Sequence, residues 1–160
     1  EDNFIDKDIS IREYLTEIIS SFKEISKKKF IFNFDQYSNE KKITKSIEIV
    51  YGLRNFIGNA NKFSKKNVYI NLKSVSQITE IIIEDDGNGY PRDILSKIGE
   101  PYLKSNNPQD KSKTGLGLGL FIGKTLLEKN FASVICRNSK TRSGAEVIIK
   151  WRNKELFNIQ

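Results

Sequence analysis

Apolar residues recur along the chain at two spacings, and each spacing predicts a different element. Steps of three and four residues predict amphipathic helices, the first of them N-capped by Ser10. These helices are expected at Ile9 to Lys28, about Lys42 to Ser64, Pro91 to Ile98, and Leu116 to Lys129. The short helix after Pro91 rests on a proline near its start rather than on a long apolar period.

Alternating apolar and polar residues predict strands instead. They are expected at Lys29 to Phe34, Asn67 to Lys73, Thr79 to Glu84, Ala132 to Asn138, and Ala145 to Trp151. A short polar connection joins the second and third of these, which predicts a hairpin, and the last two form a closing pair. Helices and strands mixed in this order predict an α/β (α+β) two-layer sandwich, with a mixed β-sheet and helices on one face.

A long polar stretch, Glu100 to Thr114, interrupts the regular segments. It holds two prolines and two asparagines and has no apolar period. Loops longer than ~12 residues in compact domains tend to be functional lids or disordered. We therefore expect a lid loop here, between two glycine-rich segments.

Composition narrows the chemistry open to the chain. Its 160 residues contain no histidine and one cysteine, and they carry a formal charge of +7. Without imidazole, a Ser-His-Asp or Cys-His triad, a histidine zinc site and a phosphohistidine acceptor are excluded within these residues. One cysteine excludes an internal disulfide. The lysines are scattered among asparagine and isoleucine, so genome composition explains the charge more simply than nucleic-acid binding does.

The length suits one domain, since ~100–150 residues is the usual domain size. No apolar run approaches the ~20 residues that span a bilayer, so we expect no direct membrane contact. Because the chain begins with Glu1 and shows no signal peptide, we expect a soluble piece of a longer protein.

The middle helix carries Asn55, Asn59 and Lys62 on one stripe, roughly opposite its apolar arc. One interpretation is a solvated helix face. The other is a pocket for Mg²⁺ and phosphate, because magnesium prefers oxygen ligands and keeps several waters. Gly52 and Gly58 favour the pocket, since glycine inside a helix costs ~1 kcal/mol relative to alanine and close approach would justify it.

A second candidate follows the apolar strand, where the sequence runs Asp85-Asp86-Gly87-Asn88-Gly89. An ordinary turn of aspartate, asparagine and glycine is one interpretation. In the other, Asp85 accepts a hydrogen bond from an exocyclic amino group, while Gly87 and Gly89 let a flat ring approach the backbone.

The third candidate is Thr114-Gly115-Leu116-Gly117-Leu118-Gly119-Leu120, expected to join the polar loop to a helix. Glycines before a helix leave its first amides free to face an anion. A P-loop is excluded, because its first glycine would fall at Leu118. A dinucleotide fingerprint is excluded as well, because a polar loop and no strand precedes the glycines.

The order of these three motifs resembles the Bergerat-type nucleotide-binding fold of sensor histidine kinases, type II topoisomerases, the ninety-kilodalton heat-shock chaperone and a mismatch-repair ATPase. The resemblance covers roughly Ile43 to Trp151. It implies ATP or ADP and Mg²⁺ as ligands. Asn59 would coordinate Mg²⁺, Asn55 and Lys62 would lie beside the phosphates, and Asp85 would bind the adenine amino group. The remaining nucleotide-binding positions it implies are Gly87, Gly89, Thr114, Gly115, Leu116, Gly117, Leu118 and Gly119.

One position selects the branch of this superfamily. Hydrolytic members place a glutamate one turn before the magnesium asparagine, and this chain has Asn55 there. Without a general base, transfer to a delivered nucleophile is favoured over attack by water. Ile98-Gly-Glu-Pro-Tyr102-Leu-Lys104 resembles the F box of histidine kinases, which adds Ile98, Tyr102 and Lys104 to the expected nucleotide site. The whole pattern is most similar to the RegB/PrrB-type redox-responsive sensor kinases.

The resemblance thus implies a cytoplasmic kinase domain whose parent is anchored in the bacterial inner membrane. Residues 29–160 would form the ATP-binding catalytic domain, and residues 1–28 a helix continuing from a dimerisation domain. That domain would supply the histidine that accepts the γ-phosphoryl group, since this piece cannot phosphorylate itself, and a response regulator would be the next partner. An ATP-gated interaction module without transfer stays open as an alternative. Cys136 is expected to be a small buried hydrophobe rather than a redox sensor.

Overall fold

The computed structural model describes residues 8–35, 37–38, 40–98 and 111–158, with the side chains of 111–115 left out. One mixed sheet runs through it in the order β2-β4-β5-β7-β6. β2 pairs parallel with β4, and every other neighbouring pair is antiparallel. The bounds are Lys29–Phe34 for β2, Asn67–Val75 for β4, Ile78–Asp85 for β5, Ser133–Asn138 for β6, and Ala145–Arg152 for β7.

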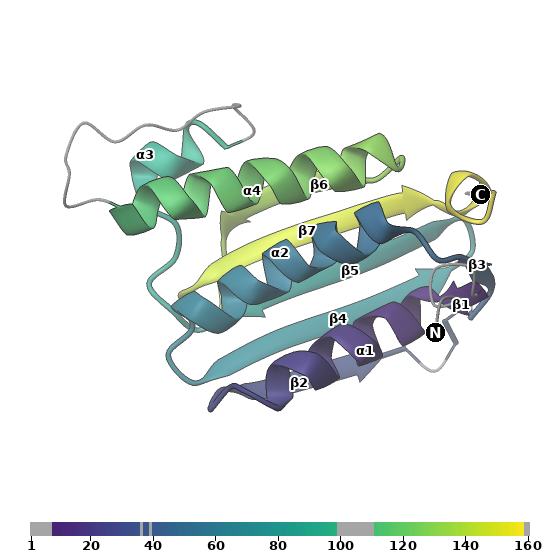
Figure 1. Cartoon of the computed structure of the whole chain (residues 1–160), viewed down its shortest axis with the longest axis horizontal. Helices are drawn as coiled ribbons and strands as arrows, with labels where there is room; N and C mark the ends of the chain where they lie inside the picture. Colours follow the sequence, from purple (N-terminus) through teal and green to yellow (C-terminus); the bar gives the residue numbers. More distant parts are fainter. Residues whose placement is uncertain (1–7, 36, 39, 99–110, 159–160) are drawn as a thin grey trace.

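The long helices all lie on one face of this sheet (Figure 1). They are α1 (Ile11–Lys23), α2 (Ile47–Phe63) and α4 (Lys111–Lys129), with two short helices, α3 (Arg92–Leu95) and α5 (Asn153–Leu156). One hydrophobic core fills the space between the layers, and it includes the buried residues of α1. The two-layer sandwich expected from the sequence is therefore confirmed.

The first helix is shorter than its apolar period predicted. Ser10 caps it with a capping box, in which the Ser10 hydroxyl accepts from the Glu13 amide and the Glu13 carboxylate accepts from the Ser10 amide. Residues 8–10 form a strand, β1 (Asp8–Ser10), and the helix ends at Lys23 instead of Lys28. The N-cap prediction was right, and the helix bounds of 9 and 28 were wrong.

The middle helix also starts later than predicted. Lys42–Thr44 is a strand, β3, which pairs antiparallel with β1 and buries Ile43 opposite Ile9. α2 begins only at Ile47, where the Ser46 hydroxyl accepts from the Ile49 amide. Ile43 and Ile47 are four residues apart, so a strand residue and a helix residue together imitated a helical period.

The glycine-rich segment lies inside α4, because this helix already begins at Lys111. The prediction that these glycines precede a helix was wrong, and so was a loop that extends to Thr114. Packing explains the difference. A Cβ on Gly119 would lie 3.5 Å from Asn59 Nδ2, which is ordinary van der Waals contact. A Cβ on Gly123, however, would lie 2.8 Å from the Phe56 ring, so the missing side chain there lets α4 lie close against α2.

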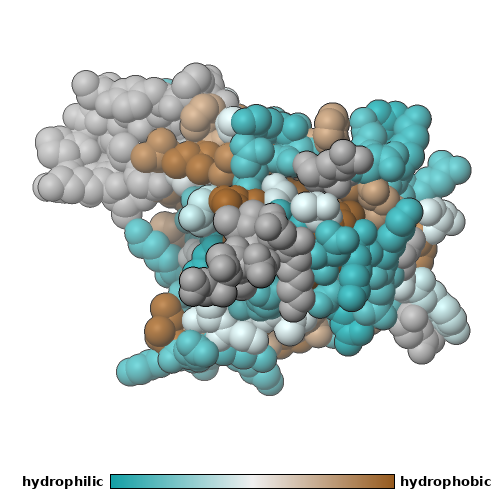
Figure 2. Space-filling view, turned by 45° about the vertical axis from the view of Figure 1, so that its right-hand side comes forward, coloured by the Kyte–Doolittle hydropathy of each residue, from teal (hydrophilic) through white to brown (hydrophobic). Residues whose placement is uncertain are grey.

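Gly52 has the same role on the opposite helix, since a Cβ there would lie 2.7 Å from Leu127 Cγ. Gly52 is therefore explained by helix packing and gives no support to a ligand pocket. Among the described helices, none is both long and apolar enough to cross a membrane. Hydrophilic residues cover most of the described surface on the side shown in Figure 2, and the hydrophobic areas there are small and separate.

Candidate functional site

A cavity of about 230 Å³ opens between α2 and the ends of β5 and β7. Its lining is mainly apolar, with one carboxylate and two side-chain amides as the polar groups. The lining residues are Phe56, Asn59, Ala60, Phe63, Ile83, Asp85, Asn88, Gly89, Tyr90, Pro91, Leu116, Ala145 and Val147. A flat apolar ring with a few polar edges is the kind of ligand that such a lining fits.

Asp85 is the charged group of this cavity and is 3% exposed. Its Oδ1 accepts hydrogen bonds from the Gly87 amide at 2.8 Å and the Ala145 amide at 3.3 Å. Burial raises the pKa of this carboxyl, and the two backbone hydrogen bonds offset part of that effect. No hydrogen bond of the described residues reaches Oδ2. The side chain thus holds one oxygen fixed and keeps one available as an acceptor.

Two glycines beside Asp85 allow the chain to fold tightly there. A Cβ on Gly87 would overlap the carbonyl oxygen of Phe63, and a Cβ on Gly144 would overlap the backbone of Asp85. Gly144 belongs to the turn between β6 and β7, so the two turns meet at the carboxylate. The sequence predicted that Gly87 lets a ring approach the backbone, whereas the structure shows it packed against the Phe63 carbonyl and outside the cavity lining, and the sequence gave no sign of the contact at Gly144.

Tyr90 forms the opposite wall and is held by Asn138, at the end of β6. Asn138 Oδ1 accepts from the Tyr90 amide at 2.6 Å, and Asn138 Nδ2 donates to the Tyr90 carbonyl at 3.3 Å. Gly89 has a φ of +80°, a conformation that favours glycine, and a Cβ there would lie 2.7 Å from Asn138 Oδ1. Gly89 lines the cavity, and both its conformation and the space beside Asn138 require glycine there.

The stripe on α2 divides between the cavity and the surface. Asn59 lines the cavity, and its Nδ2 is buried without a hydrogen-bond partner. Asn55 lies one turn earlier, beside α4, and its Nδ2 donates to the Tyr51 carbonyl at 2.7 Å. Lys62 is exposed, with Nζ 5.3 Å from the centre of the Phe63 ring. The roles of these three residues toward phosphate and metal stay predictions.

The other predicted positions are only partly described. Leu116 lines the cavity, Leu118 is 52% exposed, and Ile98 packs against the core without lining the cavity. Tyr102 and Lys104 lie outside the described residues, and of Thr114 and Gly115 only the place in α4 is described. Gly117 is buried, and Gly119 faces Asn59.

The described part of the site offers few protein groups that could bind a metal ion. This suits magnesium that is bound mainly through the oxygens of a second ligand. Within the described ranges, no three His, Cys, Asp or Glu side chains lie close enough together to hold a metal ion. Asn59 lines the cavity and carries a side-chain oxygen, Oδ1, that can ligate a metal ion, while its buried and unpartnered Nδ2 is a donor that suits a phosphate oxygen. Mg²⁺ takes oxygen ligands and is commonly bound by few protein groups together with phosphates and water. The residues present fit such an ion.

The sequence missed much of the lining because it comes from distant parts of the chain. Phe56, Phe63 and Val147 had been assigned to the core or to a strand, and they are core residues that also border the cavity. The Ala145 amide donates to the Asp85 side chain, and the Asn138 side chain accepts from the Tyr90 amide, and both partners are far away in the sequence. A lone alanine or asparagine at a strand end carries no local signal of such a contact.

Comparison with known proteins supports this geometry. The model of the family described as "Histidine kinase-, DNA gyrase B-, and HSP90-like ATPase" matches residues 44–155. Sensor histidine kinase RegB of Cereibacter sphaeroides is 38% identical over 97 residues, which cover 58% of this chain and 21% of that protein. Sensor protein SrrB of Staphylococcus aureus is 31% identical over 100 residues, or 61% of this chain and 17% of that protein. The chain spans about a fifth of the length of these relatives.

Solved structures show the same fold. The catalytic domain of histidine kinase ThkA, in a nucleotide-free form, superposes with a TM-score of 0.72 at 19% identity, covering 92% of this chain and 95% of that one. Full-length ShkA in complex with AMPPNP gives 0.68 at 20% identity, covering 91% of this chain and 30% of that one. More than nine-tenths of the chain is superposed in each case. The likeness of fold therefore extends beyond the residues that the family model matches, to α1 and β2.

Proposed function

Because the chain belongs to the histidine kinase-, DNA gyrase B- and HSP90-like ATPase family, we propose that it binds ATP in this cavity and donates the γ-phosphoryl group to a histidine. One observation carries the proposal. Asp85 is a buried carboxylate with one oxygen fixed by two amides and the other available inside a mainly apolar cavity. That oxygen can accept a hydrogen bond from the exocyclic amino group of adenine, while the apolar lining covers the ring faces.

The phosphates would then extend toward the groove between α2 and α4. Asn59 faces this side, and Asn55 and Lys62 lie one turn before and one turn after it on α2. The Asn59 Oδ1 is the side-chain oxygen that would ligate Mg²⁺ together with phosphate oxygens and water. When bound, Mg²⁺ neutralises charge on the phosphates. The Lys62 ammonium, on its flexible stem, can reach a phosphate from the exposed side of the helix.

Asn55 supports transfer rather than hydrolysis. A neutral amide cannot take a proton from water, so this position offers no general base. Catalysis would come from positioning and charge neutralisation, which is how phosphoryl transfer is generally accelerated. The acceptor is a histidine from outside these residues, because the chain contains none.

The partners and the location are part of the proposal. A dimerisation domain bearing the acceptor histidine, and a response regulator that takes the phosphoryl group onward, are the partners. The relatives are named sensor kinases and are several times longer than this chain, so they have room for such domains. A parent protein anchored in the bacterial inner membrane, with this domain on the cytoplasmic side, completes the proposal.

Titration calorimetry with ADP and Mg²⁺ tests the nucleotide site. We expect the wild type to bind and Asp85→Asn to bind about 10- to 100-fold more weakly, because hydrogen bonds to charged groups contribute about 1.5–3 kcal/mol. Asp35→Asn is the matched control, since Asp35 lies outside the cavity, after β2. A wild type that does not bind ADP contradicts the proposal, and an unchanged Asp85→Asn variant contradicts the adenine assignment.

Transfer needs a second experiment. A separately produced dimerisation domain of a RegB-type kinase would be mixed with this chain and ATP labelled at the γ-phosphate. Label on the histidine of that domain supports the kinase. Binding of nucleotide without any transfer would instead favour an ATP-gated interaction module.

A further inference from the structure

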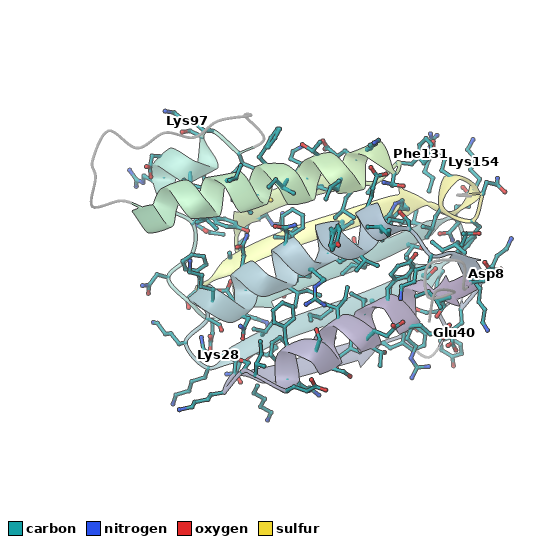
Figure 3. The ribbon with its side chains drawn as sticks, viewed as in Figure 1. Asp8, Lys28, Glu40, Lys97, Phe131 and Lys154 are labelled. Atoms are coloured by element: carbon teal, nitrogen blue, oxygen red, sulfur yellow. The ribbon has the colours of Figure 1, made fainter. Side chains whose placement is uncertain are left out.

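Lys28 lies at the end of the sheet where the α1–β2 connection, the start of β4 and the C-terminus of α2 come together (Figure 3). Its ammonium donates three hydrogen bonds to the end of α2. The acceptors are the Ser64 carbonyl at 2.5 Å, the Asn61 carbonyl at 2.9 Å and the Ser64 hydroxyl at 3.1 Å. The neighbouring Ser26 hydroxyl donates to Asn61 Oδ1 at 2.5 Å.

These contacts give hydrogen-bond donors to carbonyls at the C-terminus of α2. The last carbonyls of an α-helix have no partner within it, and the C-terminus carries the negative end of the helix dipole. A half-buried ammonium at this position is favourable because it donates hydrogen bonds to these carbonyls and because its positive charge lies at the negative end of the dipole. Lys28 therefore fixes the last turn of α2 to the connection that enters the sheet.

That same turn forms one wall of the candidate nucleotide site. Asn59, Ala60 and Phe63 line the cavity, and the Phe63 carbonyl presses against Gly87. From the other side, the Asp86 carboxylate accepts hydrogen bonds from the amides of residues 65, 66 and 67. The end of α2 is thus held between an ammonium on its carbonyls and a carboxylate on the amides that follow it.

The positive charge of Lys28 also affects the pKa of Asp85, the carboxylate that accepts hydrogen bonds in the site. Burial is the main cause that raises the pKa of Asp85, and the positive charge of Lys28 acts in the opposite direction while that of Asp86 adds to it. Lys28 precedes the residues 44–155 matched by the family model. It reaches the site from the α1–β2 connection.

We propose that Lys28 is a positioning residue for nucleotide binding: it holds the last turn of α2 so that Asn59 and Phe63 face Asp85 across the cavity. The inference rests on the proposed function, because it assigns Lys28 a role in that same nucleotide site. A residue that only stabilised the fold would lower the unfolding temperature without a selective effect on this wall.

The test compares Lys28→Met with Lys27→Met, which removes the same charge from an exposed neighbour. Titration calorimetry with ADP and Mg²⁺ should show about tenfold weaker binding for Lys28→Met and wild-type affinity for Lys27→Met. Lys28→Arg keeps the charge and several donors, so it should recover most of the affinity. Where Lys28→Met does not fold, Lys28→Gln, which removes the charge and keeps a donor, serves in its place.

Hydrogen exchange without nucleotide separates positioning from general stability. The amides of residues 61–67 should exchange faster in Lys28→Met, while those of β6 and β7 keep their wild-type protection. Equal exchange at 61–67 in both proteins overturns the inference, and so does equal ADP affinity where the wild type binds ADP. A wild type that fails to bind ADP contradicts the proposed function alone, since the exchange result still decides whether Lys28 holds this turn.

Discussion

Gly87 lies directly against the carbonyl oxygen of Phe63, so closely that a Cβ on Gly87 would overlap that oxygen. Because the obstacle is backbone at the end of a helix, it cannot turn aside as a side chain does. Gly87→Ala should therefore displace the loop after β5, lower the free energy of unfolding by roughly 1–3 kcal/mol and weaken ADP binding. Chemical denaturation and calorimetry measure the two effects.

Gly58→Ala is the control for this prediction. It also adds one methyl group in the same region, but the nearest atom is the tip of the Phe22 ring at 3.4 Å. Alanine is favoured over glycine inside a helix by about 0.5–1 kcal/mol, so this variant should be as stable as the wild type or more stable. Equal losses in both variants would contradict the close contact between Gly87 and Phe63.

Asp85→Asn should gain stability while it loses nucleotide affinity. The pKa of Asp85 is raised by burial, so its charged form disfavours the folded state at neutral pH. The raised pKa means that this cost is fully present above the folded-state value. It disappears as the pH falls through the folded pKa and then below the usual value of 3.8, where the carboxyl is protonated in both states.

Thermal unfolding of nucleotide-free protein between pH 7 and pH 4 measures this effect. Asp85→Asn should unfold at a higher temperature than the wild type at pH 7, and the difference should shrink as the pH is lowered. Asp35→Asn, outside the cavity, should show no such pattern. A variant that is less stable than the wild type at pH 7 would mean that the charge of Asp85 is compensated within the fold.

Local pattern was sufficient for the strands that carry Asp85 and its neighbours in the cavity. The hairpin of β4 and β5 and the closing pair of β6 and β7 were both predicted, since period-two alternation places one set of side chains in the core. Asp85 at the end of β5 followed from the same alternation. Its second amide donor, Ala145, lies 60 residues further along the chain, and no local pattern connects the two.

Tertiary contacts decided the places where the pattern failed. A strand of three residues, Lys42–Thr44, exists because β1 pairs with it, and that partner is more than thirty residues away. The helix expected at Leu116 to Lys129 already contained Gly119 and Gly123, but α4 begins earlier, at Lys111, so the whole glycine-rich segment is helical. Contact with α2 outweighs the low helix preference of glycine, since Gly123 gives the Phe56 ring the room to approach.

Asn138→Ala should weaken nucleotide binding by removing both hydrogen bonds to the Tyr90 backbone. Each neutral hydrogen bond contributes about 0.5–1.5 kcal/mol, so we expect a loss of about tenfold in ADP affinity. Asn33→Ala removes an exposed hydrogen bond between Asn33 on β2 and Asn71 on β4, and this variant should bind ADP normally. Full affinity in Asn138→Ala would show that Tyr90 holds its place without this amide.

Cys136 should be an unreactive thiol, although the chain resembles redox-responsive kinases. It is half-buried on β6 with Tyr90 as a hydrogen-bond partner, and burial raises its pKa to about 12. Because the thiolate is the reacting form, a shift from 9.0 to about 12 lowers its fraction roughly a thousandfold at neutral pH. Alkylation with iodoacetamide should be very slow in the folded protein and fast in denaturant. Rapid alkylation of folded protein would instead identify an exposed, activated thiol, and Cys136→Ser could then be tested for a loss of redox response in nucleotide binding.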